Sequence, residues 1–161
     1  PYRRGLDTLL AYSEQVLRNA RALGAGLAAR GIAQLTGGTD VPFVVANLQS
    51  LGLPAASLVR TLDALHVGCS AVPVPGDADF AHAHGLRFGV SALTTRGMAE
   101  AECACIAGIV ADATHALAAG RPPPVATADD VRALCRRFPI GPVTSSEADG
   151  PLVPSTRRSL P

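Results

Sequence analysis

One long amphipathic segment most constrains what this chain can fold into. From Leu6 to Arg30 apolar residues recur at helical spacing, and Gly31 follows the last turn. The apolar positions are Leu9, Leu10, Val16, Leu17, Ala20, Leu23 and Leu27. The pattern predicts a long amphipathic helix that ends near Gly31, and such a helix needs a core to cover its apolar stripe.

Shorter segments after this helix predict a sheet covered by helices. We expect strands at 32–35, 43–48, 67–72 and 86–90, and helices at 54–65, 98–117 and 127–138. Pro54 suits the first helical position, and Thr127 suits the N-cap of the last helix. The order helix, strand, strand, helix, strand, strand, helix, helix predicts a two-layer α/β sandwich.

Length and composition suit one globular domain. The 161 residues are 48% hydrophobic and 17% charged, which is too apolar for a disordered protein. We expect one domain over residues 1–140 and a disordered tail over 141–161, where the sequence is rich in Pro, Ser and Gly. The chain begins at Pro1 and not at Met, so we expect an excised or processed fragment.

Charge and apolar patterning argue against several function classes. The net charge is +1, aromatic residues make up 4%, and no basic stripe is present, which does not favour nucleic-acid binding. The longest apolar runs are far shorter than a membrane span, and no charged-then-apolar leader is seen. We therefore expect a cytoplasmic protein that binds neither nucleic acid nor membrane.

The reactive residue types are few. The 14 residues counted as Lys plus Arg are all Arg, so no side chain can form an internal Schiff base. The turns at 36–39 and 94–97 expose amides and hydroxyls that could cradle an anion, but neither has the Lys of a phosphate-binding loop. The four cysteines form no CxxC pair, and we expect reduced, mostly buried thiols. No catalytic, cofactor-binding or metal-binding residue is assigned within the chain.

Arg87 is the first candidate for a binding residue. It lies between Leu86 and Phe88 in a predicted apolar strand, where a charge is costly unless it is paired. A planar guanidinium at such a place suits bidentate binding of a carboxylate. The residues alone leave two other interpretations open, an Arg that faces water and an internal salt bridge.

His82 and His84 flank Ala83 in the loop before this strand. Two histidines at alternate positions could bind a metal or act as acid or base. The sequence shows no third ligand, so solvated loop histidines are the other interpretation, and a metal-binding module is the weakest hypothesis for the chain.

Four segments, in this order, resemble the C-terminal small domain of serine hydroxymethyltransferase. They are EQVLRNARALGAGLAARG (14–31), LTGGTD (35–40), GLRFGVSALTTRG (85–97) and VRALCRRFPI (131–140). The third is the most specific match, since it is close to the family's GIRIGT-PA-TTRG. The resemblance covers residues 12–140 with family-like spacing.

This resemblance implies the small domain of the aspartate-aminotransferase-like scaffold of fold type I pyridoxal-phosphate enzymes. In that family the large domain holds pyridoxal phosphate and the Schiff-base Lys, and the small domain supplies an Arg that grips the α-carboxylate of the amino acid. Arg87 falls on that Arg. The implied activity is a serine/glycine hydroxymethyltransferase of one-carbon metabolism, working as a homodimer on the Cα–Cβ bond. We expect the chain alone to be inactive and to need an upstream large domain or a separate Lys-bearing chain.

The chain departs from the family pattern around the folate site. Ser70 replaces the Asn of VNKNAVP that is associated with folate, so tetrahydrofolate is a possible rather than an assigned co-substrate. Other departures are Val41-Pro42 for Asn-His, Val90-Ser91 for Thr-Pro, and His82 and His84 in place of a Thr-Ser stretch. Alternatives of the same fold are a folate-independent threonine aldolase or transaldolase, and a non-catalytic partner domain of a split enzyme.

Overall fold

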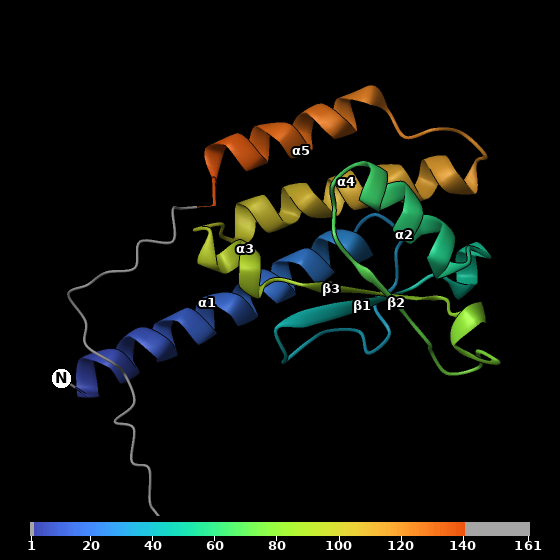
Figure 1. Cartoon of the computed structure of the whole chain (residues 1–161). Coiled ribbons are helices and arrows are strands. Elements are labelled where there is room, and N and C mark those ends of the chain that lie inside the picture. The colour runs from blue at the N-terminus through green and yellow to red at the C-terminus, as the bar shows by residue number, and fades with distance from the viewer. Residues whose placement is uncertain (1, 141–161) are drawn as a thin grey trace, which may run out of the picture.

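The computed structural model describes residues 2–140, with side-chain surroundings from Leu6 onward (Figure 1). The predicted tail at 141–161 lies outside the described residues. In chain order the elements are α1 (Tyr2–Ala28), β1 (Phe43–Asn47), the 3-10 turn η1 (Gln49–Leu51), α2 (Ala55–Ala64), β2 (Ser70–Val72), the 3-10 turn η2 (Phe80–His82), β3 (Gly85–Gly89), α3 (Ser91–Thr95), α4 (Glu100–Ala118) and α5 (Val125–Arg137). The predicted mixture of helices and strands is confirmed.

Three antiparallel strands form one sheet in the order β1-β3-β2, so β3 is the central strand. Side chains along β3 alternate, with Leu86 and Phe88 buried and Arg87 exposed. Val44 and Ala46 of β1 are buried in the same core as Leu86 and Phe88. One face of the sheet therefore packs against the helices, and the opposite face, which carries Arg87, is the more exposed one.

Helices α1 and α4 run side by side, and α5 lies on the far side of α4 (Figure 1). The buried stripe of α1 is Val16, Ala20, Leu23 and Leu27. A Cβ at Gly26 would lie 2.6 Å from the Cβ of Ala107 in α4, so this glycine lets the two helix backbones approach closely. The core is thus built around the contact of α1 with α4.

The N-terminal half of α1 differs from the prediction. Leu9 and Leu10 belong to the predicted buried stripe, yet 58% and 55% of their surface is exposed, and Leu6 beside them is 56% exposed. Burial begins only at Val16, because the sheet and α4 cover the later turns of the helix. These three leucines form an apolar strip that no described residue buries.

The strand predicted at 32–35 is wrong. Only Gln34 forms an isolated bridge, opposite Ala46 of β1. Gly31, with a φ of 80°, ends the long helix, and the chain touches the edge of β1 through two backbone bonds, Leu35 N–H to Val45 O and Asn47 N–H to Ala33 O. The turn that starts at residue 36 then carries the chain away before a strand can form. The sheet therefore has three strands and not four.

Two boundaries near helix ends also differ. Thr127 is not an N-cap, because α5 begins two residues earlier, with Pro124 as its N-cap. Thr127 lies inside the helix and is buried. The turn predicted at 94–97 is largely helical, since Ser91–Thr95 forms α3 and Arg96 follows as its C-cap. No side chain caps α5, and the Pro124 carbonyl accepts from Thr127 N–H at 3.0 Å to close its first turn.

The thiols are less buried than predicted. All four cysteines are free, but only Cys103 is buried, Cys69 is half-buried, and Cys105 and Cys135 are exposed. Burial raises the pKa of Cys69 and of Cys103 to about 11, so both stay protonated near neutral pH.

Helix α4 is the one helix in the described part of the chain whose length and hydropathy would also suit a membrane span. In the fold it lies between α1 and α5 and also contacts α2. Eight of its residues are buried, as in the central helix of a globular domain.

Candidate functional site

Arg87 occupies the middle of the central strand. It lies opposite Val45 of β1 and Ser70 of β2, so its backbone is held from both sides. Because its neighbours Leu86 and Phe88 point into the core, Arg87 points to the exposed face of the sheet. The apolar sequence around Arg87 thus reflects burial of alternate residues, and the charge itself is not buried.

The guanidinium of Arg87 lies over the ring of Phe43, with Cζ 4.6 Å from the ring centroid. This contact is a cation–π interaction, and it holds the side chain while leaving its N–H groups available. Within residues 6–140, none of the hydrogen bonds or ion pairs involves the Arg87 side chain. An internal salt bridge is therefore not found there, and Arg87 is open to an outside anion or to water.

The residues that share this face form short rows across the sheet. Strand pairing sets Phe43 opposite Gly89, and sets Val45, Arg87 and Ser70 side by side. A Cβ at Gly89 would meet nothing within 4 Å, so the surface over Gly89, next to Phe43 and Arg87, is open. A small hydroxyl, an aromatic ring and a free guanidinium thus share this face, and a guanidinium can pair with a planar carboxylate.

Three polar residues at the end of α3 have structural partners. The buried Thr94 hydroxyl donates to Val90 O at 3.0 Å and accepts from Asn19 Nδ2 at 2.8 Å. Thr95 Oγ1 lies 3.0 Å from the hydroxyl of Tyr12. Arg96 Nε donates to Phe138 O at 2.7 Å. These contacts fasten α3 to α1 and to the end of α5.

Asn19 is a structural residue that the sequence reasoning missed. It is fully buried, and its Nδ2 donates to Thr94 Oγ1 and to Met98 O at 2.9 Å. A signal was present, because Asn19 follows Val16 by three residues and precedes Leu23 by four, which places it on the apolar face of the helix. A polar residue on such a face must find partners in the core.

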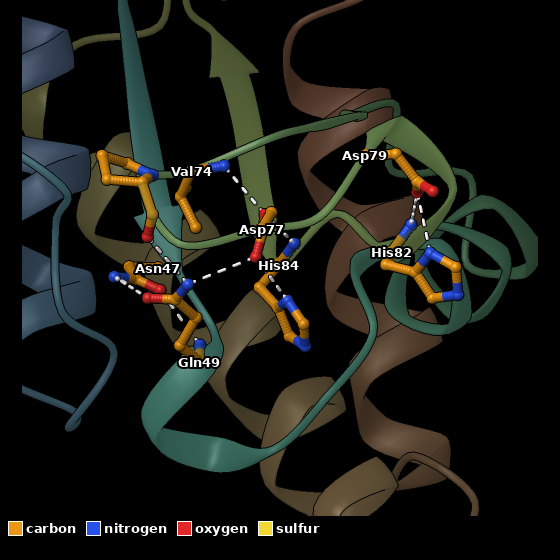
Figure 2. A network of polar contacts seen from close by, with 8 residues as sticks. Asn47, Gln49, Val74, Asp77, Asp79, His82 and His84 are labelled. Atoms are coloured by element: carbon orange, nitrogen blue, oxygen red, sulfur yellow. Dashed lines mark hydrogen bonds and ion pairs between the residues drawn. The ribbon is translucent and has the colours of Figure 1, made fainter.

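His82 and His84 belong to two separate pairs (Figure 2). His82 Nδ1 lies 2.7 Å from Asp79 Oδ1 at an exposed turn. His84 Nδ1 lies 2.7 Å from Asp77 Oδ1, and the Asp77 side chain is only 1% exposed. The described residues contain no group of three or more metal-ligating side chains, so this loop shows no metal site.

The two aspartates of this loop are held ionised. Burial raises the pKa of Asp77, but its hydrogen bonds lower the pKa by more than burial raises it. The donors are the backbones of Val74 and His84 and the side chains of His84 and Gln49, and the pKa of Asp77 lies well below its usual range. The hydrogen bonds from His82 lower the pKa of Asp79. Neither aspartate was singled out from the sequence, because their partners follow at different spacings and from different elements.

The turn at 36–39 borders an open depression of about 810 Å³ beside β1. Its polar groups already have partners. Thr39 Oγ1 donates to Phe43 O at 2.7 Å, and Arg21 Nη2 forms an ion pair with Asp40 at 2.7 Å. This turn therefore fixes the entry into β1, and the structure gives no sign of an anion site there.

Comparison with known proteins shows which family this chain is similar to. The family model for serine hydroxymethyltransferase matches residues 6–110. The chain is 43% identical over 91 residues to a serine hydroxymethyltransferase of Bombyx mori, covering 56% of this chain and 20% of the relative. It is 38% identical over 137 residues to a serine hydroxymethyltransferase of Rippkaea orientalis, covering 82% and 31%. It is also 38% identical over 132 residues to a 2-methylserine hydroxymethyltransferase of a Paracoccus species, covering 80% and 31%.

The chain spans a fifth to a third of the length of these curated relatives. The matched region nevertheless includes most of α1, the whole sheet with Arg87, and more than half of α4. Such a match covers more than half of the chain and every element that positions Arg87, and on this ground the chain belongs to the serine hydroxymethyltransferase family.

Proposed function

We propose that this chain is the small domain of a pyridoxal-phosphate-dependent hydroxymethyltransferase and that Arg87 binds the α-carboxylate of its amino-acid substrate. The observation that carries the proposal is the free guanidinium of Arg87 on the exposed face of the central strand. Family membership supports a serine hydroxymethyltransferase-type reaction, and the fold type I scaffold of that family is part of the proposal.

The geometry suits a substrate clamp. A guanidinium presents two parallel N–H donors, which match the two oxygens of a carboxylate. The backbone of Arg87 is paired with both neighbouring strands, and the Phe43 ring packs against the guanidinium. The clamp therefore loses little conformational freedom when the substrate binds, and it can fix the orientation of the substrate Cα relative to a cofactor.

The chain does not fit the role of cofactor holder. It contains no Lys, so the amine that binds pyridoxal phosphate in the family must come from other residues. We place the cofactor on an upstream large domain or on a separate Lys-bearing chain, in an enzyme that works as a homodimer. The exposed strip of Leu6, Leu9 and Leu10 supports a larger assembly, since three neighbouring leucines favour a covered surface. The chain alone is accordingly proposed to be inactive.

The proposed substrate is a hydroxymethyl-bearing amino acid. Relatives at equal identity are named for serine and for 2-methylserine, which differ by one methyl group on Cα. Both share the α-carboxylate that Arg87 would bind, so serine and glycine are the first substrates to test and 2-methylserine the second. The location of the enzyme stays a prediction, and one relative, from Candida glabrata, is named as mitochondrial.

Ser70 bears on the choice of co-substrate. Ser70 lies next to Arg87 on the exposed face, where a change of side chain alters the surroundings of the substrate. This position favours keeping a folate-independent aldolase or transaldolase as a second candidate. Transfer of the hydroxymethyl group of serine only in the presence of tetrahydrofolate would support the first candidate, and turnover of threonine with an added aldehyde would support the second.

The test of Arg87 uses the complete enzyme that contains this domain. Arg87→Lys keeps the charge but loses the paired donors, so we expect the amino-acid KM to rise roughly 10- to 100-fold, as for charge-assisted hydrogen bonds worth about 1.5–3 kcal/mol. Arg60→Lys is the matched control, because Arg60 is exposed on α2 and its side chain hydrogen-bonds only to Ser57 among the described residues. An unchanged KM in Arg87→Lys would overturn the assignment.

A further inference from the structure

The loop before β3 contains a buried charge that the proposed chemistry does not use. Asp77 is 1% exposed at its side chain, and burial of an ionised carboxylate is costly unless hydrogen bonds replace its water. Four donors do so. Asp77 Oδ2 accepts from Val74 N at 2.8 Å and from His84 N at 2.9 Å, and Oδ1 accepts from His84 Nδ1 at 2.7 Å and from Gln49 Nε2 at 3.2 Å. Such a fully bonded carboxylate is a rigid point of attachment.

The donors to Asp77 come from three places in the chain (Figure 2). Val74 lies at the start of the loop, Gln49 follows β1, and His84 directly precedes β3. Gln49 also donates to Pro75 O at 3.0 Å, and its own N–H donates to Asn47 Oδ1 at 3.0 Å. The network therefore joins the end of β1, the loop and the start of β3.

His84 connects this hydrogen-bond network to β3. An ionised carboxylate only accepts hydrogen bonds, so Nδ1 of His84 must carry the proton that it shares with Asp77. The backbone carbonyl of His84 also accepts from Leu48 N–H at 2.9 Å. Side chain, amide and carbonyl of His84 are thus all bonded, one residue before the strand begins.

The register of β3 depends on the position of His84. The first pair of the strand is Asn47 with Gly85, and the next pair on the same face is Val45 with Arg87. A slip of one residue would turn Arg87 toward the helices, because the side chains of a strand alternate between its two faces. Fixing His84 therefore fixes the face and direction of Arg87, three residues further along.

From this geometry we infer that Asp77 and His84 are positioning residues for substrate binding, which hold Arg87 in the orientation that the carboxylate needs. The inference rests on the proposed function of Arg87. It makes the unusual His at position 84 part of the substrate-binding apparatus, although it does not touch the substrate. It also distinguishes the two His–Asp pairs, since Asp79 and His82 lie at an exposed turn and bond only within it.

The test compares three variants of the complete enzyme. His84→Ala removes the Nδ1 donor, and we expect the amino-acid KM to rise roughly 10-fold with kcat changed less than about twofold, as for loss of one hydrogen bond to a charged group. His84→Asn supplies an amide donor at a similar reach, and we expect KM to return to within about threefold of the original value. His82→Ala, the matched control, should leave both constants unchanged.

The outcomes separate this inference from the function on which it rests. If Arg87→Lys raises KM but His84→Ala behaves like His82→Ala, the positioning role is wrong and the carboxylate clamp stands. If Arg87→Lys leaves KM unchanged, the clamp itself fails and the inference falls with it. Amide hydrogen exchange gives a second readout that does not depend on folding losses in one variant. Residues 85–89 should exchange roughly 10-fold faster in His84→Ala than in His82→Ala, as expected when one charged hydrogen bond is lost, and equal rates would overturn the positioning role.

Discussion

Replacement of Gly85 by alanine tests whether the start of β3 is as tightly packed as the positioning role requires. A Cβ built on Gly85 would lie 2.5 Å from Val72 O, 2.7 Å from Val74 Cγ1 and 2.9 Å from Val72 Cγ2. All three distances are shorter than van der Waals contact, and the shortest involves a backbone oxygen of the paired strand β2. The added methyl group must therefore displace β2 or the loop that follows it.

The size of the effect follows from these contacts. The backbone angles at Gly85 are ones that L residues adopt, so the cost comes from overpacking and not from the backbone. Inserting one carbon into a packed site costs about 1–3 kcal/mol, which lowers the melting temperature of a domain of this size by about 2 to 12 °C. Thermal unfolding followed by circular dichroism measures this shift directly.

Gly89, in the same strand and on the same face, provides the control. A Cβ there would meet nothing within 4 Å, so Gly89→Ala should be neutral or stabilise the fold by about 0.4–1 kcal/mol through the unfolded state. If Gly85→Ala melts at the temperature of Gly89→Ala, the packing of Val72 and Val74 onto Gly85 is not as tight as described. The reasoning that ties the loop to β3 would then lose its basis.

Two further predictions concern buried polar groups. Asn19→Ala should lower the free energy of unfolding by about 1–3 kcal/mol in urea denaturation, because Thr94 and Met98 O lose their donor in the core. An unchanged midpoint would mean that water replaces the amide. The lowered pKa of Asp77 stabilises the fold fully above the ordinary aspartate pKa of about 3.9, and this contribution is lost as the pH falls from there toward the lower folded value. Asp77→Asn should therefore be less stable than the original chain at pH 7, and the difference should shrink below about pH 4; a constant difference would contradict this.

The spacing of apolar residues predicted those parts of the fold that depend on the sequence of a single helix or strand. The spacing of Val16, Leu23 and Leu27 predicted the long helix, and the alternation around Arg87 predicted a strand. The same patterns could not tell how far the partner elements reach, so Leu9 and Leu10 were expected in the core although nothing in the described chain covers them. Hydrophobic spacing states which face is apolar and not whether another element covers it.

At the candidate site, too, the sequence predicted one residue but not the residues around it. The residue itself, Arg87, was found from its apolar neighbours, and its exposure follows from strand alternation. Its surroundings were not predictable, because Phe43 precedes Arg87 by 44 positions in the chain. The two residues meet only after β1 pairs with β3. The Asp77 network joins three segments whose contacts depend on how the loop closes, and no short spacing in the sequence records that closure.

The two borders of the sheet bear on how the free chain can associate. On the outer side of β1, Val45 O and Asn47 N–H are already bonded to residues 33–35. At the other border, β2 has only three residues, and Pro73 follows with no N–H to offer. Neither border presents the long row of unpaired backbone groups from which sheets grow between molecules. Self-association of the free chain should therefore start at Leu6, Leu9 and Leu10 and not by strand addition.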